Sequence, residues 1–82
     1  LEDLVLDWFT IEPGAAAIGK TIRDLQARTI TGASIVSIVE PNNVKRTNPE
    51  ADTVLNEGAT LVLAGDRKTI AALKKLIIQG KV

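Results

Sequence analysis

The chain of 82 residues contains no cysteine and no histidine. It therefore forms no disulfide, and it lacks the cysteine and histidine ligands of ordinary zinc sites. Without histidine it also cannot assemble a catalytic triad that uses histidine as its base. The only aromatic residues are Trp8 and Phe9. Two aromatics are too few for a surface on which successive nucleic-acid bases stack.

An excess of charge of one sign is also missing, because ten basic residues balance ten acidic ones. Proteins that bind nucleic acids usually carry a basic patch or stripe, so we expect neither DNA nor RNA as a partner. The apolar runs are only a few residues long, whereas a membrane-spanning helix needs about 20. No signal peptide is visible. We expect a cytoplasmic location, either free or at the inner face of the cell membrane.

The length suits one small domain, which we place over residues 1–82. The sequence begins at Leu1, without an initiating methionine and inside an apparent strand. We therefore expect the chain to be a fragment of a longer protein.

Local patterns predict an alternation of strands and helices. Runs of β-branched and apolar residues between turn residues predict strands. Thr21 and Asp66 are typical helix N-caps, and Gly80 is a typical helix stop. We predict strands over residues 4–11, 34–40, 44–47 and 60–64, and helices over 21–28 and 67–79.

The apolar spacing of the two helices indicates one buried side for each. In the second helix that side consists of Ile70, Leu73 and Ile77, broadened by Leu76, with Lys68, Lys74 and Lys75 facing water. The strand over residues 34–40 is so rich in β-branched residues that we expect it to be buried on both faces. The fold class is α+β: a small β-α-β-β-β-α domain with a mostly antiparallel sheet and both helices on one face.

Three pieces of the sequence resemble one known family. They are IGKTIRDLQAR (18–28), GASIVSIVEPNN (32–43) and NPEADTVLNEGATLVLAGDRKTIAAL (48–73). Together they resemble the C-terminal domain of regulators of potassium conductance, which is also called the TrkA-C or RCK_C domain. Trp8-Phe9, Glu12-Pro13-Gly14 and Asn48-Pro49 look most similar to the regulatory subunits of bacterial potassium/proton antiporters.

This resemblance implies a homodimer that senses a ligand and controls a cation channel, transporter or antiporter membrane subunit allosterically. Several members of the family bind the nucleotide cyclic di-AMP across the dimer interface. The alternatives from other classes are a dimerisation module without a ligand and a module that holds a divalent ion through Asp or Glu.

The resemblance also implies a set of ligand-binding residues. Arg28 matches the position of an arginine that contacts a phosphate, and Ser34 matches a polar group that reaches the phosphates. Gln26 matches a side chain at the edge of the adenine. The implied apolar bed for the adenine consists of Ile22, Ile30, Ile35 and Pro49, and Asn48 completes the set. Arg23, one helical turn and a little more before Arg28, is expected on a different face of the helix.

Catalytic chemistry has little support in the sequence. The acidic pair Asp3/Asp7 is expected on a surface face of a strand, and the pair Glu50/Asp52 lies in a link without a partner base or metal ligand. Hydrolysis by two carboxylates requires them to converge in a cleft. The glycines do not form a phosphate-binding loop. We therefore expect no enzyme activity and no metal cofactor. Lys74, Lys75 and Lys81 form a modest basic edge, which we interpret as a solvated helix face.

Overall fold

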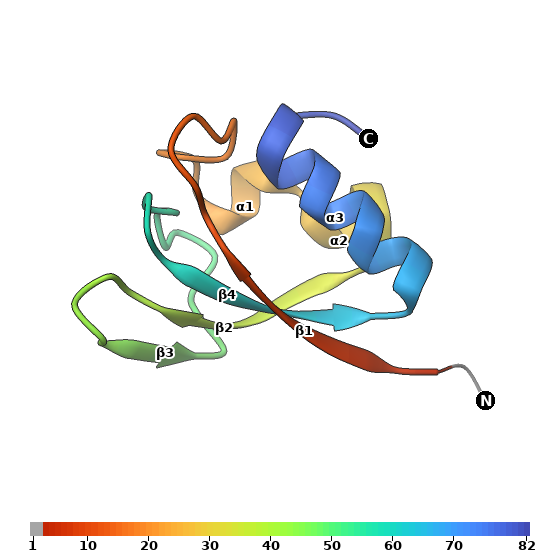
Figure 1. The fold of residues 1–82 in the computed structure, drawn as a ribbon, viewed down its shortest axis with the longest axis horizontal. Helices are drawn as coiled ribbons and strands as arrows, with labels where there is room; N and C mark the ends of the chain where they lie inside the picture. The colour runs from red at the N-terminus through yellow and green to blue at the C-terminus, as the bar shows by residue number, and fades with distance from the viewer. Residues whose placement is uncertain (1–2) are drawn as a thin grey trace.

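The computed structural model describes residues 3–82 and shows a single four-stranded sheet with helices on one side (Figure 1). All strand pairs are antiparallel, and the order across the sheet is β1-β4-β2-β3. The strands are β1 (Val5–Thr10), β2 (Ser34–Val39), β3 (Lys45–Thr47) and β4 (Thr60–Gly65). The helices are α1 (Ile22–Leu25), α2 (Ala27–Thr31) and α3 (Arg67–Gln79). The α+β class and the β-α-β-β-β-α order expected from the sequence are confirmed, with α1 and α2 forming the first helical unit.

Helix α3 has the bounds that the sequence predicts. The Asp66 carboxylate accepts a hydrogen bond from the Thr69 backbone N–H (2.7 Å), and the Asp66 N–H donates to Thr69 Oγ1 (3.0 Å). These two bonds form a capping box, which satisfies two donors at the helix start. The predicted apolar side of α3 is buried against the sheet. With 13 residues, α3 is the longest helix, so no helix within residues 3–82 could cross a membrane.

The first predicted helix is divided into two short segments. Thr21 caps α1 as expected, since its hydroxyl accepts a bond from the Asp24 N–H (3.1 Å). Gln26 then adopts the left-handed conformation, with φ of 53°, and ends α1. Helix α2 follows and stops at Gly32, whose φ of 87° favours glycine. The interruption turns α2 away from the direction of α1.

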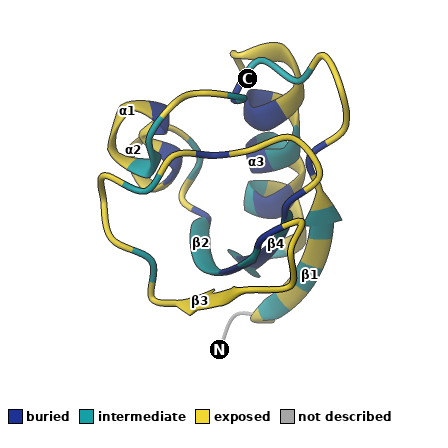
Figure 2. Cartoon of the chain, turned by 90° about the vertical axis from the view of Figure 1, so that its left-hand side faces the viewer, coloured by how far each residue is buried: buried dark blue, intermediate teal, exposed yellow. Residues whose placement is uncertain are grey.

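The two faces of the sheet have different surroundings. Leu61 and Leu63 of β4 point towards the helices and are fully buried. Ile38 of β2 lies on the same face, with only 1% of its surface exposed. Leu6 and Trp8 of β1 lie on the opposite face and are largely exposed (51% and 61%). Figure 2 shows this division, with the dark buried residues concentrated between the sheet and α3.

The expectation that the strand over residues 34–40 is buried on both faces is wrong. Only Ile38 and Glu40 are buried in that segment, and the remaining residues are intermediate. The cause is the architecture: the helices cover one side of the sheet, and no other part of residues 3–82 covers the second side. A run of β-branched residues does not reveal how many layers pack on it.

One of the lysines expected to face water lies instead between α3 and β1. Lys74 Nζ is 2.6 Å from Asp7 Oδ2 and 5.6 Å from the centre of the Phe9 ring. Both side chains of the ion pair are about one-third exposed. Asp7 therefore points to the helix side of β1, and its ion pair with Lys74 links β1 to α3.

The start of β2 is fixed by close packing against the start of α3. A Cβ added to Gly65 would lie 2.4 Å from Thr69 Oγ1 and 3.1 Å from the Ala33 side chain. Ala33 itself is completely buried. This contact anchors the corner between α2 and β2, and with it the position of Ser34 and Ile35.

Candidate functional site

An open hollow of about 370 Å³ lies where α1, α2 and the start of β2 meet. Its lining combines polar and apolar side chains from three successive elements: Ile22, Arg23, Gln26, Ala27, Arg28, Thr29, Ser34 and Ile35. Ala27 is buried, and Ile22 and Ile35 are half-buried and pack against the hydrophobic core. The hollow thus has an apolar floor and a polar rim, as small-molecule sites usually do.

The positive charge of this hollow comes from side chains and not from the start of α1. The N–H groups of Ile22 and Arg23 donate to the backbone carbonyls of Thr53 (3.0 Å) and Ala51 (2.8 Å). The Asp24 N–H is bonded to the Thr21 hydroxyl. Because these donors are already used, they cannot bind an anion in the way a free helix N-terminus does.

Gln26 brings two arginines to the same hollow. On a continuous helix, residues five apart point in directions about 140° apart, which is the basis for placing Arg23 and Arg28 on different faces. That placement is wrong, because the left-handed conformation of Gln26 reorients α2, and both side chains line the hollow. Neither arginine forms an ion pair with an acidic residue within residues 3–82. Both are exposed, so their guanidinium groups are available to a ligand.

The hydroxyl and amide groups of the rim add directional hydrogen-bonding capacity. Ser34 is half-buried at the start of β2, and Gln26 and Thr29 are exposed on the helical side. A guanidinium group fits the oxygens of a phosphate or carboxylate with two parallel bonds. Together with the apolar floor, the set can hold a molecule that has both an anionic group and a flat apolar part.

The structure brings five of the eight residues expected from the sequence into this hollow: Ile22, Gln26, Arg28, Ser34 and Ile35. The other three do not line it. Ile30 is on α2 but 45% exposed outside the hollow. The Asn48 N–H donates to the Val36 carbonyl (3.1 Å), next to the bulge in β2, and Pro49 follows it.

Sequence reasoning missed Arg23, Ala27 and Thr29. Ala27 could have been found from the sequence. It is a small apolar residue between the polar residues Gln26 and Arg28, and such a residue is favoured where a helix packs closely against its neighbours. No local signal in the sequence predicts that the helix is interrupted at Gln26, because the left-handed backbone conformation is usually adopted by Gly or Asn. Without that break, Arg23 cannot be assigned to the site.

A second polar cluster lies at the other end of β2. Glu40 is the buried charged residue within residues 3–82, and its carboxylate accepts bonds from Arg46 Nε (2.8 Å) and Asn56 Nδ2 (3.3 Å). These bonds join the β2–β3 hairpin to the segment before β4, so the cluster has a structural role. Within residues 3–82, no three acidic side chains lie close enough together to hold a metal ion.

Comparison with known proteins places these features in a family. The family model of the TrkA-C domain matches residues 6–78. The chain is 43% identical over 75 residues to KhtT, a K⁺/H⁺ antiporter subunit of Bacillus subtilis, and the match covers 92% of this chain and 44% of KhtT. The chain thus spans less than half the length of that relative. The similarity to antiporter regulatory subunits expected from the sequence is confirmed.

Solved structures show the same fold. A GsuK channel bound to NAD superposes with a TM-score of 0.78 at 30% identity, over 95% of this chain and 14% of the channel chain. The RCK_C domain dimer of BusR from S. agalactiae, in complex with c-di-AMP, superposes with a TM-score of 0.79 at 24% identity, over 92% of this chain and 90% of that one. The family model covers nearly all of the chain and the fold agrees with it, so the chain belongs to the TrkA-C (RCK_C) domain family.

Proposed function

We propose that the hollow between α1, α2 and β2 binds cyclic di-AMP. The observation that carries this proposal is the presence of two arginines without ion-pair partners at the rim of a hollow floored by Ile22, Ala27 and Ile35. Cyclic di-AMP presents phosphates and flat adenine rings, which match a guanidinium and an apolar floor respectively. The BusR domain of the same fold, solved with c-di-AMP, supports the choice of ligand.

Each group in the hollow has a role in this proposal. Arg28 binds a phosphate with its planar fork of donors, and Arg23 adds a second positive charge from α1. Ser34 donates to the phosphate oxygens, and Gln26 meets the polar edge of the adenine. Ile22 and Ile35 provide the surface on which the ring lies.

The proposed site is completed by a second copy of the chain. A hollow that is open in one chain binds a ligand more tightly when a partner covers it, and cyclic di-AMP has two-fold symmetry. An isologous dimer presents the same groups twice around its axis, so one ligand meets two copies of Arg28. Ile30, with almost half of its surface exposed beside the hollow, is a candidate dimer contact. Asn48 and Pro49 follow the β2 edge and are proposed to join the site in the dimer.

The biological role that we propose is control of potassium or other cation transport. Ligand binding favours one geometry of the dimer, and this preference is passed to an antiporter, channel or transporter subunit at the inner face of the membrane. The relationship to KhtT supports an antiporter as the partner. The proposed activity is regulatory, without catalysis and without a metal cofactor.

Calorimetric titration with cyclic di-AMP tests the proposal. A lost charge-assisted hydrogen bond costs about 1.5–3 kcal/mol. Two symmetric copies of Arg28→Ala should therefore weaken binding by about two to four orders of magnitude. Arg67→Ala is the matched control, because Arg67 is an exposed arginine at the start of α3 and does not line the hollow. If the parent chain does not bind at hundred-micromolar ligand, the alternative of a dimerisation module without a ligand is preferred.

A further inference from the structure

The sheet has two outer edges, and they differ in how well they are protected. One edge is β3, which has three exposed residues, Lys45, Arg46 and Thr47. Short length and positive charge are common devices that keep an edge from pairing with another strand. The other edge is β1, with six residues that are alternately half-buried and exposed. Within residues 3–82, β1 pairs only with β4, so its outer row of backbone groups has no strand partner.

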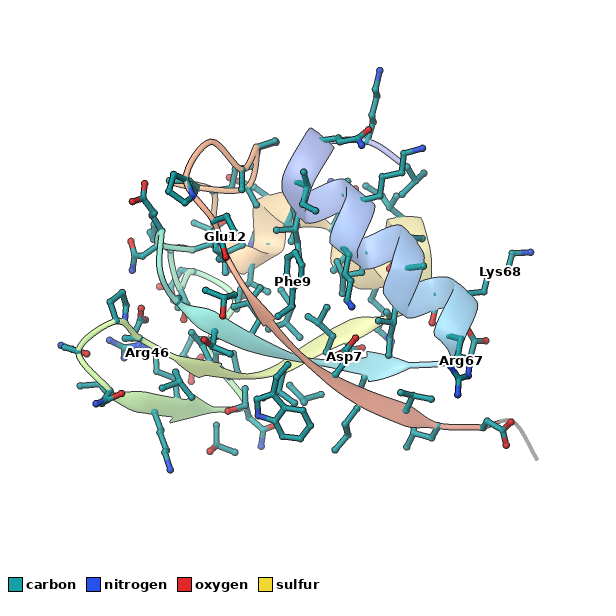
Figure 3. The ribbon with its side chains drawn as sticks, viewed as in Figure 1. Asp7, Phe9, Glu12, Arg46, Arg67 and Lys68 are labelled. Atoms are coloured by element: carbon teal, nitrogen blue, oxygen red, sulfur yellow. The ribbon has the colours of Figure 1, made fainter. Side chains whose placement is uncertain are left out.

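Two hollows lie between β1 and helix α3, one towards each end of β1. We refer to this pair of hollows as the groove. The first, of about 340 Å³, is mostly apolar and is lined by Phe9, Glu12, Pro13, Gly14, Ala15 and Ile78. The second, of about 210 Å³, is lined by Val5, Asp7, Arg67, Ile70, Ala71 and Lys74. The labelled side chains in Figure 3 follow this course: Asp7 and Phe9 lie on β1, Glu12 lies just beyond its end, and Arg67 lies at the start of α3.

We propose that this groove docks an extended segment of another protein, which adds to β1 as a fifth, antiparallel strand. Addition of a strand to an exposed edge beside a helix is an established way of binding peptides: backbone bonds supply affinity and alternate side chains supply specificity. The proposal goes beyond the ligand site, which lies on α1, α2 and β2.

The spacing of the hollows fixes the pattern of the segment. Val5 and Phe9 are four residues apart, or about 13 Å along the strand. They point to the same face, so two peptide side chains opposite them are also four residues apart. The residue midway between these two faces the ion pair of Asp7 and Lys74 and is polar. The pattern is therefore apolar-x-polar-x-apolar.

Charges at the ends of the groove set the direction of the segment. Glu12 lies at the end where β1 finishes, and Arg67 lies at the end where β1 starts. An antiparallel segment places its N-terminal part near Glu12 and its C-terminal part near Arg67. A basic residue before the pattern and an acidic residue after it complement these two charges.

A lone segment fits the groove better than a second copy of this chain does. In a second copy, Val5 and Phe9 pack against their own core and are not free to enter the hollows. Pairing of two β1 strands in the register that matches Val5 with Phe9 would also bring two Asp7 carboxylates opposite each other, and like charges directly opposite are destabilising. The occupant that we infer is thus a partner protein.

The probe is the peptide Lys-Thr-Leu-Thr-Gln-Thr-Val-Thr-Glu with blocked ends. Trp8 is the single tryptophan, lies on β1 and is largely exposed, so its fluorescence reports binding at this edge. Hydrogen exchange is the second readout: the β1 amides that are not bonded to β4 should become protected. The same peptide with alternate residues N-methylated, which removes its strand donors, should not bind.

Two variants block the hollows without touching the core. Ala71→Glu and Ile78→Glu each place a charge in one hollow, at exposed positions of α3. Each should weaken peptide binding by about ten- to hundredfold, because the burial of one apolar side chain contributes a free energy of that size to binding. Gln79→Glu is the control, with the same change of charge at an exposed α3 position outside both hollows, and it should bind like the parent.

Three results would overturn the proposal. The first is absence of binding at millimolar peptide, and the second is equal binding by the parent and both hollow variants. The third is a dimer that light scattering detects in the parent and that Ile78→Glu dissociates, since the groove would then belong to a second copy. Cyclic di-AMP binding should be unchanged in both hollow variants, which separates this test from that of the ligand site.

Discussion

Arg23 and Arg28 line one hollow, although they belong to two helical segments with Gln26 between them. Their convergence depends on a single backbone conformation, the left-handed Gln26. The two guanidinium groups carry the only positive charges of the hollow. This arrangement makes both arginines part of the proposed ligand site and leads to the first prediction.

Arg23→Ala should weaken cyclic di-AMP binding, because it removes one of two positive charges at the rim. We expect a loss of at least about tenfold, which corresponds to 1.4 kcal/mol, and a smaller loss than for Arg28→Ala. Calorimetric titration of both single variants and the double variant measures this. Parent-like binding by Arg23→Ala would show that only α2 contacts the phosphate.

Gln26→Gly should leave the protein as stable as the parent or raise its stability by up to about 1 kcal/mol. A glycine within a helix normally lowers stability by about 0.5–1 kcal/mol, but at a left-handed position it relieves backbone strain. Chemical denaturation followed by circular dichroism gives the difference. Ala27→Gly, one residue later at the first position of α2, is the comparison and should be destabilising, because it also removes a buried methyl group.

Gly65→Ala should destabilise the fold by about 1–3 kcal/mol, the usual cost of overpacking. The added methyl would stand 2.4 Å from Thr69 Oγ1, and Thr69 belongs to the capping box of α3. Thermal unfolding measures the loss. Adding Thr69→Ser to the Gly65→Ala variant keeps the hydroxyl and should not recover the lost stability, because the hydroxyl is the group that the added methyl would clash with.

Leu61→Ala should lower the free energy of unfolding by about 2–5 kcal/mol, because Leu61 is fully buried between sheet and helices. Lys75→Ala, on the exposed side of α3, should change it by about 0.5 kcal/mol or less. Both values come from urea denaturation. Similar losses for the two variants would contradict the assignment of the buried faces.

Asp66 should make stability depend on pH in the acid range. Hydrogen bonds from the Thr69 backbone and side chain hold the pKa of Asp66 below its ordinary value. A lowered pKa in the folded state means that the ionised group stabilises the fold above the unfolded pKa, about 3.9, and that this contribution is lost as the pH falls through the folded pKa. Asp66→Asn keeps an N-cap but does not titrate, so its unfolding free energy should fall less than that of the parent below about pH 4. Equal pH profiles would exclude this role.

Much of the fold follows from short-range signals in the sequence. Helix α3 has a capping residue, a clear apolar side and a terminal glycine within 15 residues, and each of these acts locally. Its predicted bounds are therefore confirmed at both ends. The strands are bounded by glycine, proline and asparagine turns and are confirmed to within one residue at each end.

Other features depend on distant parts of the chain and could not be predicted. The open face of the sheet is one of them, because burial of β2 depends on how many layers the whole fold provides. The tie between Lys74 and Asp7 requires two residues far apart in sequence to meet. At the candidate site, five of the eight residues that the resemblance indicated line the hollow. The contribution of Arg23 depends on the conformation of Gln26, which no local rule anticipates.

The strand order has a consequence for how the chain folds during synthesis. The central strand β4, over Thr60–Gly65, is the last strand in sequence and yet pairs with both β1 and β2. Before β4 is made, β1 has no strand neighbour, and the only two strands of the sheet that can pair are those of the short β2–β3 hairpin. Formation of the sheet must therefore wait until about four-fifths of the domain has been translated, and closing the loop from β1 to β4 slows it further. A nascent chain that stops before residue 60 should remain open to proteases, whatever the propensity of its individual segments.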